Sequence, residues 1–297
     1  MANSNGWGDG ASNNTIGWGQ GANNAIGWGD SHLKSWAGAT DIVGLTTDAD
    51  AQAFITAAAI TDATQQTAID TLVKGLKDDG IWTKMKAIYP FVGGTASTHK
   101  FNLVNPVDSD AAFRLVFNGG WTHSSTGALP NGTNAYADTK LIPSTSFSSN
   151  NSSFGVYSRT DNINGENFMG TSTTTANRLF MYVKFTALGA SQFNHNSQTF
   201  ANPLLLNSSG YFHSNRIAAG TQKVFVNGAL NTTMAANEQG LSTVPIFLSS
   251  SNISGSASGF SNRQLAFAHF ADGLTDTEAT NLYTRVQAFQ TALSRQV

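Results

Sequence analysis

Five residues between positions 121 and 138 carry side chains suited to binding a sugar. Trp121 and Tyr136 offer flat aromatic faces on which a pyranose ring can stack, and His123, Asn134 and Asp138 can hydrogen-bond its hydroxyl groups. The surrounding stretch, GGWTHSSTGALPNGTNAYADT, is rich in turn-forming residues and predicts loops. The pattern predicts a carbohydrate-binding surface. The alternative, which the sequence favours slightly, is that Trp121 seals a sandwich edge beside a structural turn.

The chain offers little for hydrolytic chemistry. Cleavage of a glycosidic bond requires two carboxyl groups at a defined separation. The glutamates are Glu166, Glu238 and Glu278; the first two stand alone in turn-rich sequence, and Glu278 belongs to a helix-capping pattern. We therefore predict no catalytic residue, no enzymatic activity and no cofactor.

One segment partly matches the pattern of a calcium-binding loop. Residues 161–166 read DNINGE, but Ile163 stands at the third position, where a calcium loop requires an oxygen ligand. Asn164-Gly165 is equally well explained as a turn, which leaves a bound cation as the minority interpretation. The six histidines form no HxH or HxxxH pair, so we predict no metal site.

Charge and cysteine content exclude several classes of protein. The chain has 18 acidic and 16 basic residues, and only 11% of its residues are charged, against about 25% in an average soluble domain. No basic cluster is present to bind nucleic acid. Because there is no cysteine, disulfides and thiolate metal sites are excluded. No apolar run is long enough to span a membrane and no secretory signal is visible, so we expect no membrane partner and synthesis in a cytoplasm.

The elements that must position these side chains are short strands. Gln222 to Thr232 reads QKVFVNGALNT, in which Asn227-Gly228 predicts a tight type I′ hairpin. Further alternating segments are FRLVF (113–117), FGVYS (154–158), LFMYVKF (179–185), PIFLS (245–249) and QLAFAHF (264–270). This rhythm predicts a mainly β protein with a two-sheet sandwich over residues 91–297.

Helices are predicted on either side of the strands. Residues 46–90 predict a helical collar, with one apolar face formed by Ile69, Leu72, Val73 and Leu76. Its modest apolar face suggests pairing with other copies of the chain. The end of the collar predicts a further short helix through Trp82, Met85 and Ile88, stopped by Pro90. A capping box that begins at Thr275 predicts a C-terminal helix over residues 275–295.

Residues 1–45 form a repeat-containing arm. Tryptophans recur 11, 10 and 8 residues apart between glycines, at positions Trp7, Trp18, Trp28 and Trp36, with Ile16 and Ile26 before two of them. So little apolar area cannot offset a backbone ordering cost of about 1–2 kcal/mol per residue, so the arm is expected to order only against a partner. Periodic tryptophans are typical of docking anchors, although a low-complexity linker is the alternative.

The segments FNGGW…ALPNGTNAYADT, SFGVYSRT, KVFVNGAL and FAHFADGLTDTEATNLYTRVQAFQTALSRQV together suggest a family. They resemble the concanavalin A-like (laminin G-like) jelly-roll module found in virion proteins of tailed bacteriophages, over residues 46–297. The GWG-repeat arm is similar to N-terminal segments of virion proteins from crAss-like and related gut phages. No ligand-binding motif of the family matches this chain, so no site residue follows from the resemblance.

The resemblance implies a structural protein of the virion surface, either a head fibre or a decoration protein. In this interpretation residues 1–45 dock to the capsid or to another virion protein, and the jelly-roll head projects outward. The alternative is a tail-associated adhesin that binds host-surface carbohydrate, and a glycan-degrading virion enzyme comes third. We expect self-association, with a trimer ahead of a dimer because phage fibres commonly have threefold symmetry.

Overall fold

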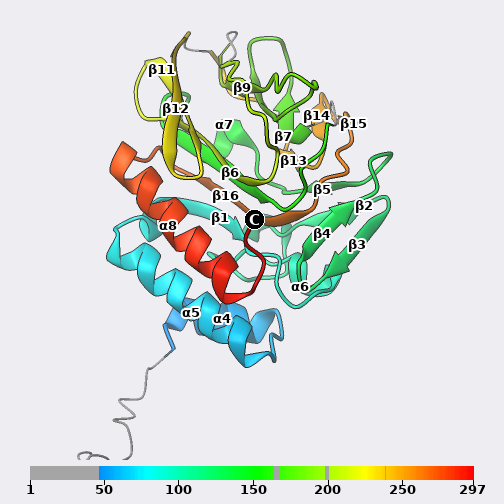
Figure 1. Cartoon of the computed structure of the whole chain (residues 1–297), viewed down its shortest axis with the longest axis vertical. Helices are drawn as coiled ribbons and strands as arrows, with labels where there is room; N and C mark the ends of the chain where they lie inside the picture. The colour runs from blue at the N-terminus through cyan, green and yellow to red at the C-terminus, as the bar shows by residue number, and fades with distance from the viewer. Residues whose placement is uncertain (1–46, 164–166, 198–200, 238) are drawn as a thin grey trace, which may run out of the picture. The chain divides into compact units, whose positions relative to one another are not determined.

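A computed structural model describes residues 47–163, 167–197, 201–237 and 239–297. The predicted docking arm, with its tryptophans and isoleucines, lies outside the described residues, as do Glu166 and Glu238. Residues Asp48–Val297 form one compact unit, shown in Figure 1.

The chain folds into two large β-sheets, as predicted. The first sheet has the strand order β12-β11-β10-β6-β16-β4-β3, with β1 also paired to β16. Its strands are β1 (Met85–Tyr89), β3 (Trp121–Ser124), β4 (Gly127–Pro130), β6 (Ser152–Ser158), β10 (Gly210–Arg216), β11 (Gly220–Val226), β12 (Ala229–Ala236) and β16 (Leu265–Ala271).

The second sheet has the order β15-β14-β7-β13-β5-β2, and β8 and β9 extend it beyond β7. Its strands are β2 (Val116–Asn118), β5 (Tyr136–Asp138), β7 (Asn167–Ser172), β8 (Arg178–Tyr182), β9 (Gln192–His195), β13 (Phe247–Leu248), β14 (Ser251–Ile253) and β15 (Ser256–Ser258). Only the β7–β14 pair is parallel among the pairings of the described strands. The fold is a jelly-roll type β-sandwich.

A hydrophobic core fills the space between the sheets. Phe168 of the second sheet stacks on Phe212 of the first, with ring centroids 5.9 Å apart. Phe154, Val156 and Met181 belong to the same buried cluster. The alternating pattern read from FGVYS and LFMYVKF therefore does face a common core, as a sandwich requires.

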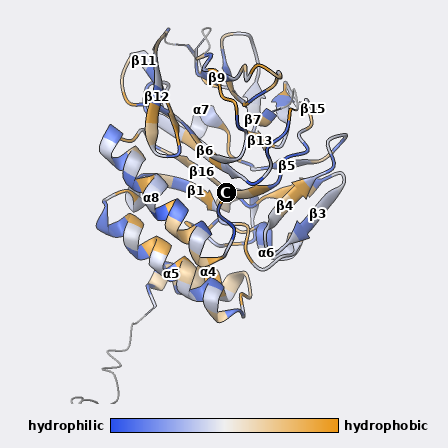
Figure 2. Ribbon diagram, viewed as in Figure 1, coloured by the Kyte–Doolittle hydropathy of each residue, from blue (hydrophilic) through white to orange (hydrophobic). Residues whose placement is uncertain are grey.

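Helices cover the outer face of the first sheet. They are α4 (Ala49–Ala57), α5 (Ala63–Asp78) and α8 (Asp276–Ala292), and Figure 1 shows α5 and α8 side by side. Leu72, Leu76 and Phe289 from these helices share one buried cluster with Phe267 of the sheet. In Figure 2 these helices carry both hydrophobic and hydrophilic residues, as expected for elements with one buried face.

The helices of the predicted collar thus pack against the outer face of the first sheet and form a second buried cluster there, separate from the core between the sheets. A fragment that began at residue 91 would lose β1 from the first sheet and most of this helical layer. Among the described helices none is long and apolar enough to cross a membrane.

The predicted short helix through Trp82, Met85 and Ile88 is wrong. A single 3-10 turn, η2 (Trp82–Lys84), leads into strand β1, which pairs antiparallel with β16. Nearly every residue of β1 is buried. A strand covered on both faces reads as a short apolar run, which periodicity cannot distinguish from a buried helical turn.

Local signals are confirmed where the sequence states them strongly. Asn227 and Gly228 have φ angles of 48° and 76° at the hairpin between β11 and β12. Thr275 forms the predicted reciprocal capping box with Glu278 at the start of α8. The structure also shows that Asp62 caps α5. The remaining short elements are α6 (Ala96–His99), η3 (Asp110–Ala112) and α7 (Pro143–Ser146).

Candidate functional site

Trp121 lies at the open edge of the sandwich, where the edge strand of the first sheet, β3, approaches the edge strand of the second, β2. It comes from β3 of the first sheet, and its ring meets Phe117 of β2 edge-on, with centroids 5.2 Å apart. His123, two residues further along β3, stacks beside Trp121 at 6.1 Å and an interplanar angle of 25°. The indole nitrogen of Trp121 donates to the carbonyl of Asn118 at 2.9 Å. The ring is half-buried, so it closes the sandwich edge while keeping part of its surface toward solvent.

His123 also meets a second histidine that sequence spacing did not indicate. Its Nδ1 lies 2.9 Å from Nδ1 of His99, at the end of α6. His99 is buried against Phe91, and burial, with the charges of His123 and Arg295, lowers the pKa of His99 to about 3. Burial also lowers the pKa of His123. Both rings are therefore neutral near pH 7, and the N–H of one ring donates a hydrogen bond to the nitrogen of the other.

A pair of glycines brings a polar loop against this aromatic edge. A Cβ atom on Gly119 would lie 2.2 Å from the carbonyl oxygen of Asn134, and one on Gly120 would lie 2.4 Å from Nδ2 of Asn131. Only glycine permits such close approach. Asn134 then accepts hydrogen bonds through Oδ1 from the Gly120 N–H, at 3.1 Å, and from Asn131 Nδ2, at 2.8 Å. The exposed amide of Asn134 is thereby fixed one residue from Trp121.

Tyr136 and Asp138 lie on the other side of the second sheet. Strands β2 and β5 pair Phe117 with Ala137, which both face the core, and Asn118 with Tyr136. Because neighbouring residues of a strand point to opposite faces, Tyr136 and Asp138 point outward.

On the outer face, the two side chains have their own partners. The ring of Tyr136 stacks on Phe247 at 4.5 Å. Asp138 pairs with Lys140 at 3.0 Å. The predicted five-residue group is therefore divided: Trp121, His123 and Asn134 come together at the edge, whereas Tyr136 and Asp138 belong to the outer face.

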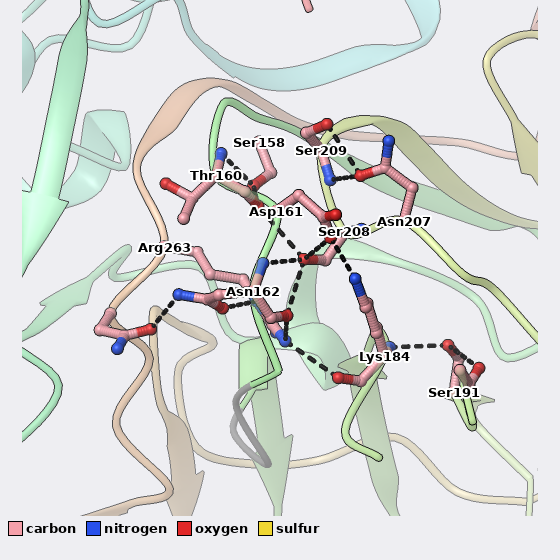
Figure 3. A network of polar contacts seen from close by, with 12 residues as sticks. Ser158, Thr160, Asp161, Asn162, Lys184, Ser191, Asn207, Ser208, Ser209 and Arg263 are labelled. Atoms are coloured by element: carbon pink, nitrogen blue, oxygen red, sulfur yellow. Dashed lines mark hydrogen bonds and ion pairs between the residues drawn. The ribbon is translucent and has the colours of Figure 1, made fainter. Parts of the chain in front are cut away.

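A second polar cluster, which the sequence analysis did not bring together, joins the loops at one end of the sandwich (Figure 3). Oδ1 of Asp161 accepts from the backbone N–H of Ser208 at 2.9 Å and pairs with Nζ of Lys184 at 2.6 Å. Buried Arg263 donates to Oδ1 of Asn162 at 2.9 Å and to the carbonyl of Lys184 at 3.2 Å. The start of the suspected calcium loop is thus paired with a lysine, and residues 164–166 lie outside the described chain.

One Ser–His contact resembles part of a catalytic apparatus but is placed for structure. His195 bonds Ser152 through Nε2, at 2.8 Å, and Ser214 through Nδ1, at 3.0 Å. All three side chains are buried, and the Arg216 guanidinium, a positive charge, donates to the carbonyl of His195. A nucleophile and its base need access to substrate and a group that stabilises the charged base.

Glu278 caps α8 and pairs with Lys84 at 2.6 Å, so it serves the helix. Within the described ranges, no three His, Asp, Glu or Cys side chains gather closely enough to hold a metal ion.

No protein-family description and no curated protein sequence matches the chain. Its fold is similar to several solved structures. Domain 4 of an extracellular arabinanase from Geobacillus stearothermophilus, in complex with arabinotriose, is 13% identical at a TM-score of 0.46, covering 67% of this chain and 98% of that one. The CBM40 of the Ruminococcus gnavus IT-sialidase, bound to α2,3-sialyllactose, is 11% identical at a TM-score of 0.40, covering 56% and 94%.

A third structure is that of botulinum neurotoxin type C, whose cell entry depends on interaction with two ganglioside molecules. It is 9% identical at a TM-score of 0.50, covering 70% of this chain and about half (52%) of the toxin chain. At 9% identity the likeness to the neurotoxin concerns the fold alone.

Proposed function

We propose that this chain is a binding protein of a bacteriophage particle whose sandwich recognises carbohydrate. The observation that carries the carbohydrate part is the edge site, where Trp121 is half-buried and the exposed amide of Asn134 is bonded to the N–H of Gly120, the residue before Trp121. Stacking on an aromatic face supplies affinity for a sugar, and a fixed amide supplies hydrogen bonds that select its hydroxyl pattern.

The edge site is rigid before any ligand arrives. Trp121 is held by the Asn118 carbonyl and by Phe117, and Asn134 is held across Gly120. A site whose side chains are already ordered loses less entropy on binding. The similarly folded neurotoxin, which interacts with gangliosides, makes glycans the first ligand class to test.

The virion part of the proposal rests on the sequence. A repeat arm that cannot fold alone is joined to a domain that can, and the arm's tryptophans are suited to fill pockets on a capsid or other virion protein. In this proposal the protein sits on the virion surface, as a head fibre or decoration protein, and self-associates as a trimer. A tail-associated adhesin is the second candidate, favoured if carbohydrate affinity proves to be the main property.

We propose binding without turnover, because the chain's glutamates offer no identified acid–base pair. A glycan array probed with the full-length chain is the direct experiment. Binding to surface polysaccharides that is lost in Trp121→Ala and kept in Trp82→Ala would support the edge site, since Trp82 is also half-buried but lies against the helical layer. Absence of any bound glycan would remove the carbohydrate function. Breakdown of a bound glycan on prolonged incubation would contradict the absence of catalysis.

A further inference from the structure

Three leucines project from two adjoining loop segments at the end of the second sheet. Leu188, Leu204 and Leu206 are 81%, 72% and 74% exposed, more than any other large hydrophobic side chain in the described ranges. Scattered surface leucines are common, but exposure of this extent on neighbouring segments is not.

The two segments lie against each other. Ala190 and Leu204 form an antiparallel bridge, and the N–H of Leu205 donates to the carbonyl of Gly189 at 2.7 Å. Leu205 is buried, so its neighbours Leu204 and Leu206 point the opposite way, toward solvent. A Cβ on Gly189 would lie 3.1 Å from Cδ2 of Leu206, which places the side chain of Leu206 over the residue next to Leu188. We call Leu188, Leu204 and Leu206 the leucine tip.

The tip stands on a rigid polar base, visible in Figure 3. One carboxylate, that of Asp161, bonds both Ser208, two residues after Leu206, and Lys184, four residues before Leu188. The N–H of Lys184 also donates to Ser191 Oγ at 2.8 Å. Both tip segments are therefore anchored to the same group, so the leucines are presented in a fixed arrangement.

The two segments that carry the tip contain no charge. Residues 185–191 (FTALGAS) and 201–209 (ANPLLLNSS) contain no charged side chain. In the base, Lys184 and Asp161 neutralise each other at 2.6 Å, and the third charged group, the guanidinium of Arg263, is fully buried. A partner attracted by charge, such as an acidic protein or an anionic lipid surface, therefore meets no charged side chain on residues 185–191 and 201–209.

The size of the leucine tip distinguishes between two remaining partners, a second copy of the chain and an uncharged lipid surface. Three leucine side chains cover on the order of 400 Å², in the range of functional patches on monomers. A stable interface with a second copy requires about 800 Å² from each partner. Separate projecting side chains suit instead a medium that accepts each one individually, as the interfacial region of a lipid bilayer does.

We propose that the leucine tip inserts shallowly into an uncharged, zwitterionic lipid bilayer. The sequence predicts no membrane partner because no segment can span a bilayer, but insertion of loop tips requires no span. This contact goes beyond carbohydrate binding at the edge site and uses none of its residues. In a host-attaching particle it would add a lipid contact to a glycan contact.

The chain has no cysteine, so one introduced thiol can be labelled cleanly. The test uses the full chain with Leu206→Cys carrying the polarity-sensitive dye NBD, and phosphatidylcholine vesicles free of glycolipid. The dye should brighten and shift to the blue when vesicles are added, equally at about 0.1 M and 0.5 M salt. The matched control is Leu230→Cys with the same dye; Leu230 is 48% exposed on β12 and should give no change.

Vesicle flotation gives a second, label-free measurement. Leu204→Ser with Leu206→Ser should lower the partition coefficient at least about tenfold, because two leucines leave the bilayer contact. Leu230→Ser and Trp121→Ala should leave it unchanged; Trp121→Ala is expected to affect glycan binding alone. All the substituted leucines are exposed, so folding, checked by circular dichroism, should persist.

Two results would overturn the proposal. One is a wild-type chain that neither floats with the vesicles nor changes the NBD signal at position 206. The other is a dimer or larger oligomer, measured by light scattering, that the Leu204→Ser, Leu206→Ser variant converts to monomer without any vesicle binding. The second result would make the leucine tip a protein interface.

Discussion

Nδ1 of His99 and Nδ1 of His123 lie 2.9 Å apart, linking helix α6 to the edge strand that carries Trp121. In a neutral pair one nitrogen donates and the other accepts, whereas two protonated rings would both present donors and repel. The geometry of the edge site therefore depends on these histidines remaining neutral.

The stability of the fold should fall as the pH falls below about 6.5. Burial lowers the pKa of His195, His213 and His269, as it does that of His99. In the unfolded chain these histidines bind protons below about pH 6.5. In the folded chain they bind protons only at a lower pH, because their pKa values are lowered. Between these two pH values, protonation therefore favours the unfolded state. Above about pH 7 these groups are neutral in both states and contribute no slope. Urea unfolding measured across this range should show the loss.

The contribution of His213 to the pH dependence of the free energy of unfolding can be measured separately. Burial lowers its pKa to about 3, and its ring packs among Tyr211, Phe225 and His269 with no hydrogen-bond partner for either nitrogen in the described residues. His213→Phe keeps the ring and removes the titration. Between about pH 7 and pH 5, the free energy of unfolding of the variant should fall by about 2 kcal/mol less than that of the wild type. Equal pH slopes for the two proteins would refute this assignment.

Gly119 should be indispensable for the edge site. Its φ is +73°, and an added Cβ would strike the carbonyl of Asn134 at 2.2 Å. Gly220 has a similar φ, +81°, with nothing within 4 Å of the added atom. Gly220→Ala should therefore cost only the backbone strain, about 1–2 kcal/mol. Gly119→Ala should cost more and also abolish glycan binding; equal effects of the two substitutions would contradict the proposed role of the close contact.

Arg295 should be among the most sensitive residues of the fold. Its buried guanidinium donates to the carbonyls of Phe91, Pro90 and Ala266 and to Oε1 of Gln290, at 2.8 to 3.1 Å. Arg295→Ala would remove these four donated hydrogen bonds, with Gln290 Nε2 still donating to the Ala266 carbonyl, and should lower the free energy of unfolding by about 3–5 kcal/mol.

The control for Arg295 is Arg114, which pairs with Asp108 and Asp110 in an exposed position. Arg114→Ala should hardly move the urea midpoint, because exposed ion pairs contribute little. Similar midpoints for the two alanine variants would show that the C-terminal segment is not fixed by Arg295.

Local chemistry made the hairpin and the helix starts predictable. The turn at Asn227-Gly228 and the capping box of Thr275 depend on residues within a few positions of each other. Strand β1 was missed because its pairing with β16, about 180 residues away along the chain, decides its conformation, and periodicity carries no information on such a partner.

The division of the predicted sugar site has the same origin. Whether Tyr136 shares a face with Trp121 depends on the register between β2 and β5, which pairs Tyr136 with Asn118. The polar base of the leucine tip joins Asp161, Lys184 and Ser208, each from a separate loop. Their types were visible in the sequence, but their convergence depends on the closed sandwich.

The arm makes a prediction that is independent of the sandwich. Trp18→Ala with Trp28→Ala should reduce incorporation of the protein into particles severalfold, because each tryptophan is proposed to fill a pocket on a virion protein. Quantitative blotting of purified particles measures this. Unchanged incorporation would mean that the arm is a linker, and attachment would have to be sought elsewhere in the chain.

The central claim is that Trp121 and Asn134 bind carbohydrate. Its most direct measurement is isothermal titration of the full-length chain with the strongest glycan from an array, compared with Trp121→Ala and Trp82→Ala. The account predicts millimolar or tighter binding by the wild type and by Trp82→Ala, and at least about tenfold weaker binding by Trp121→Ala, since stacking on an aromatic ring is lost. Undiminished affinity in a folded Trp121→Ala variant would contradict it and move the search to another surface.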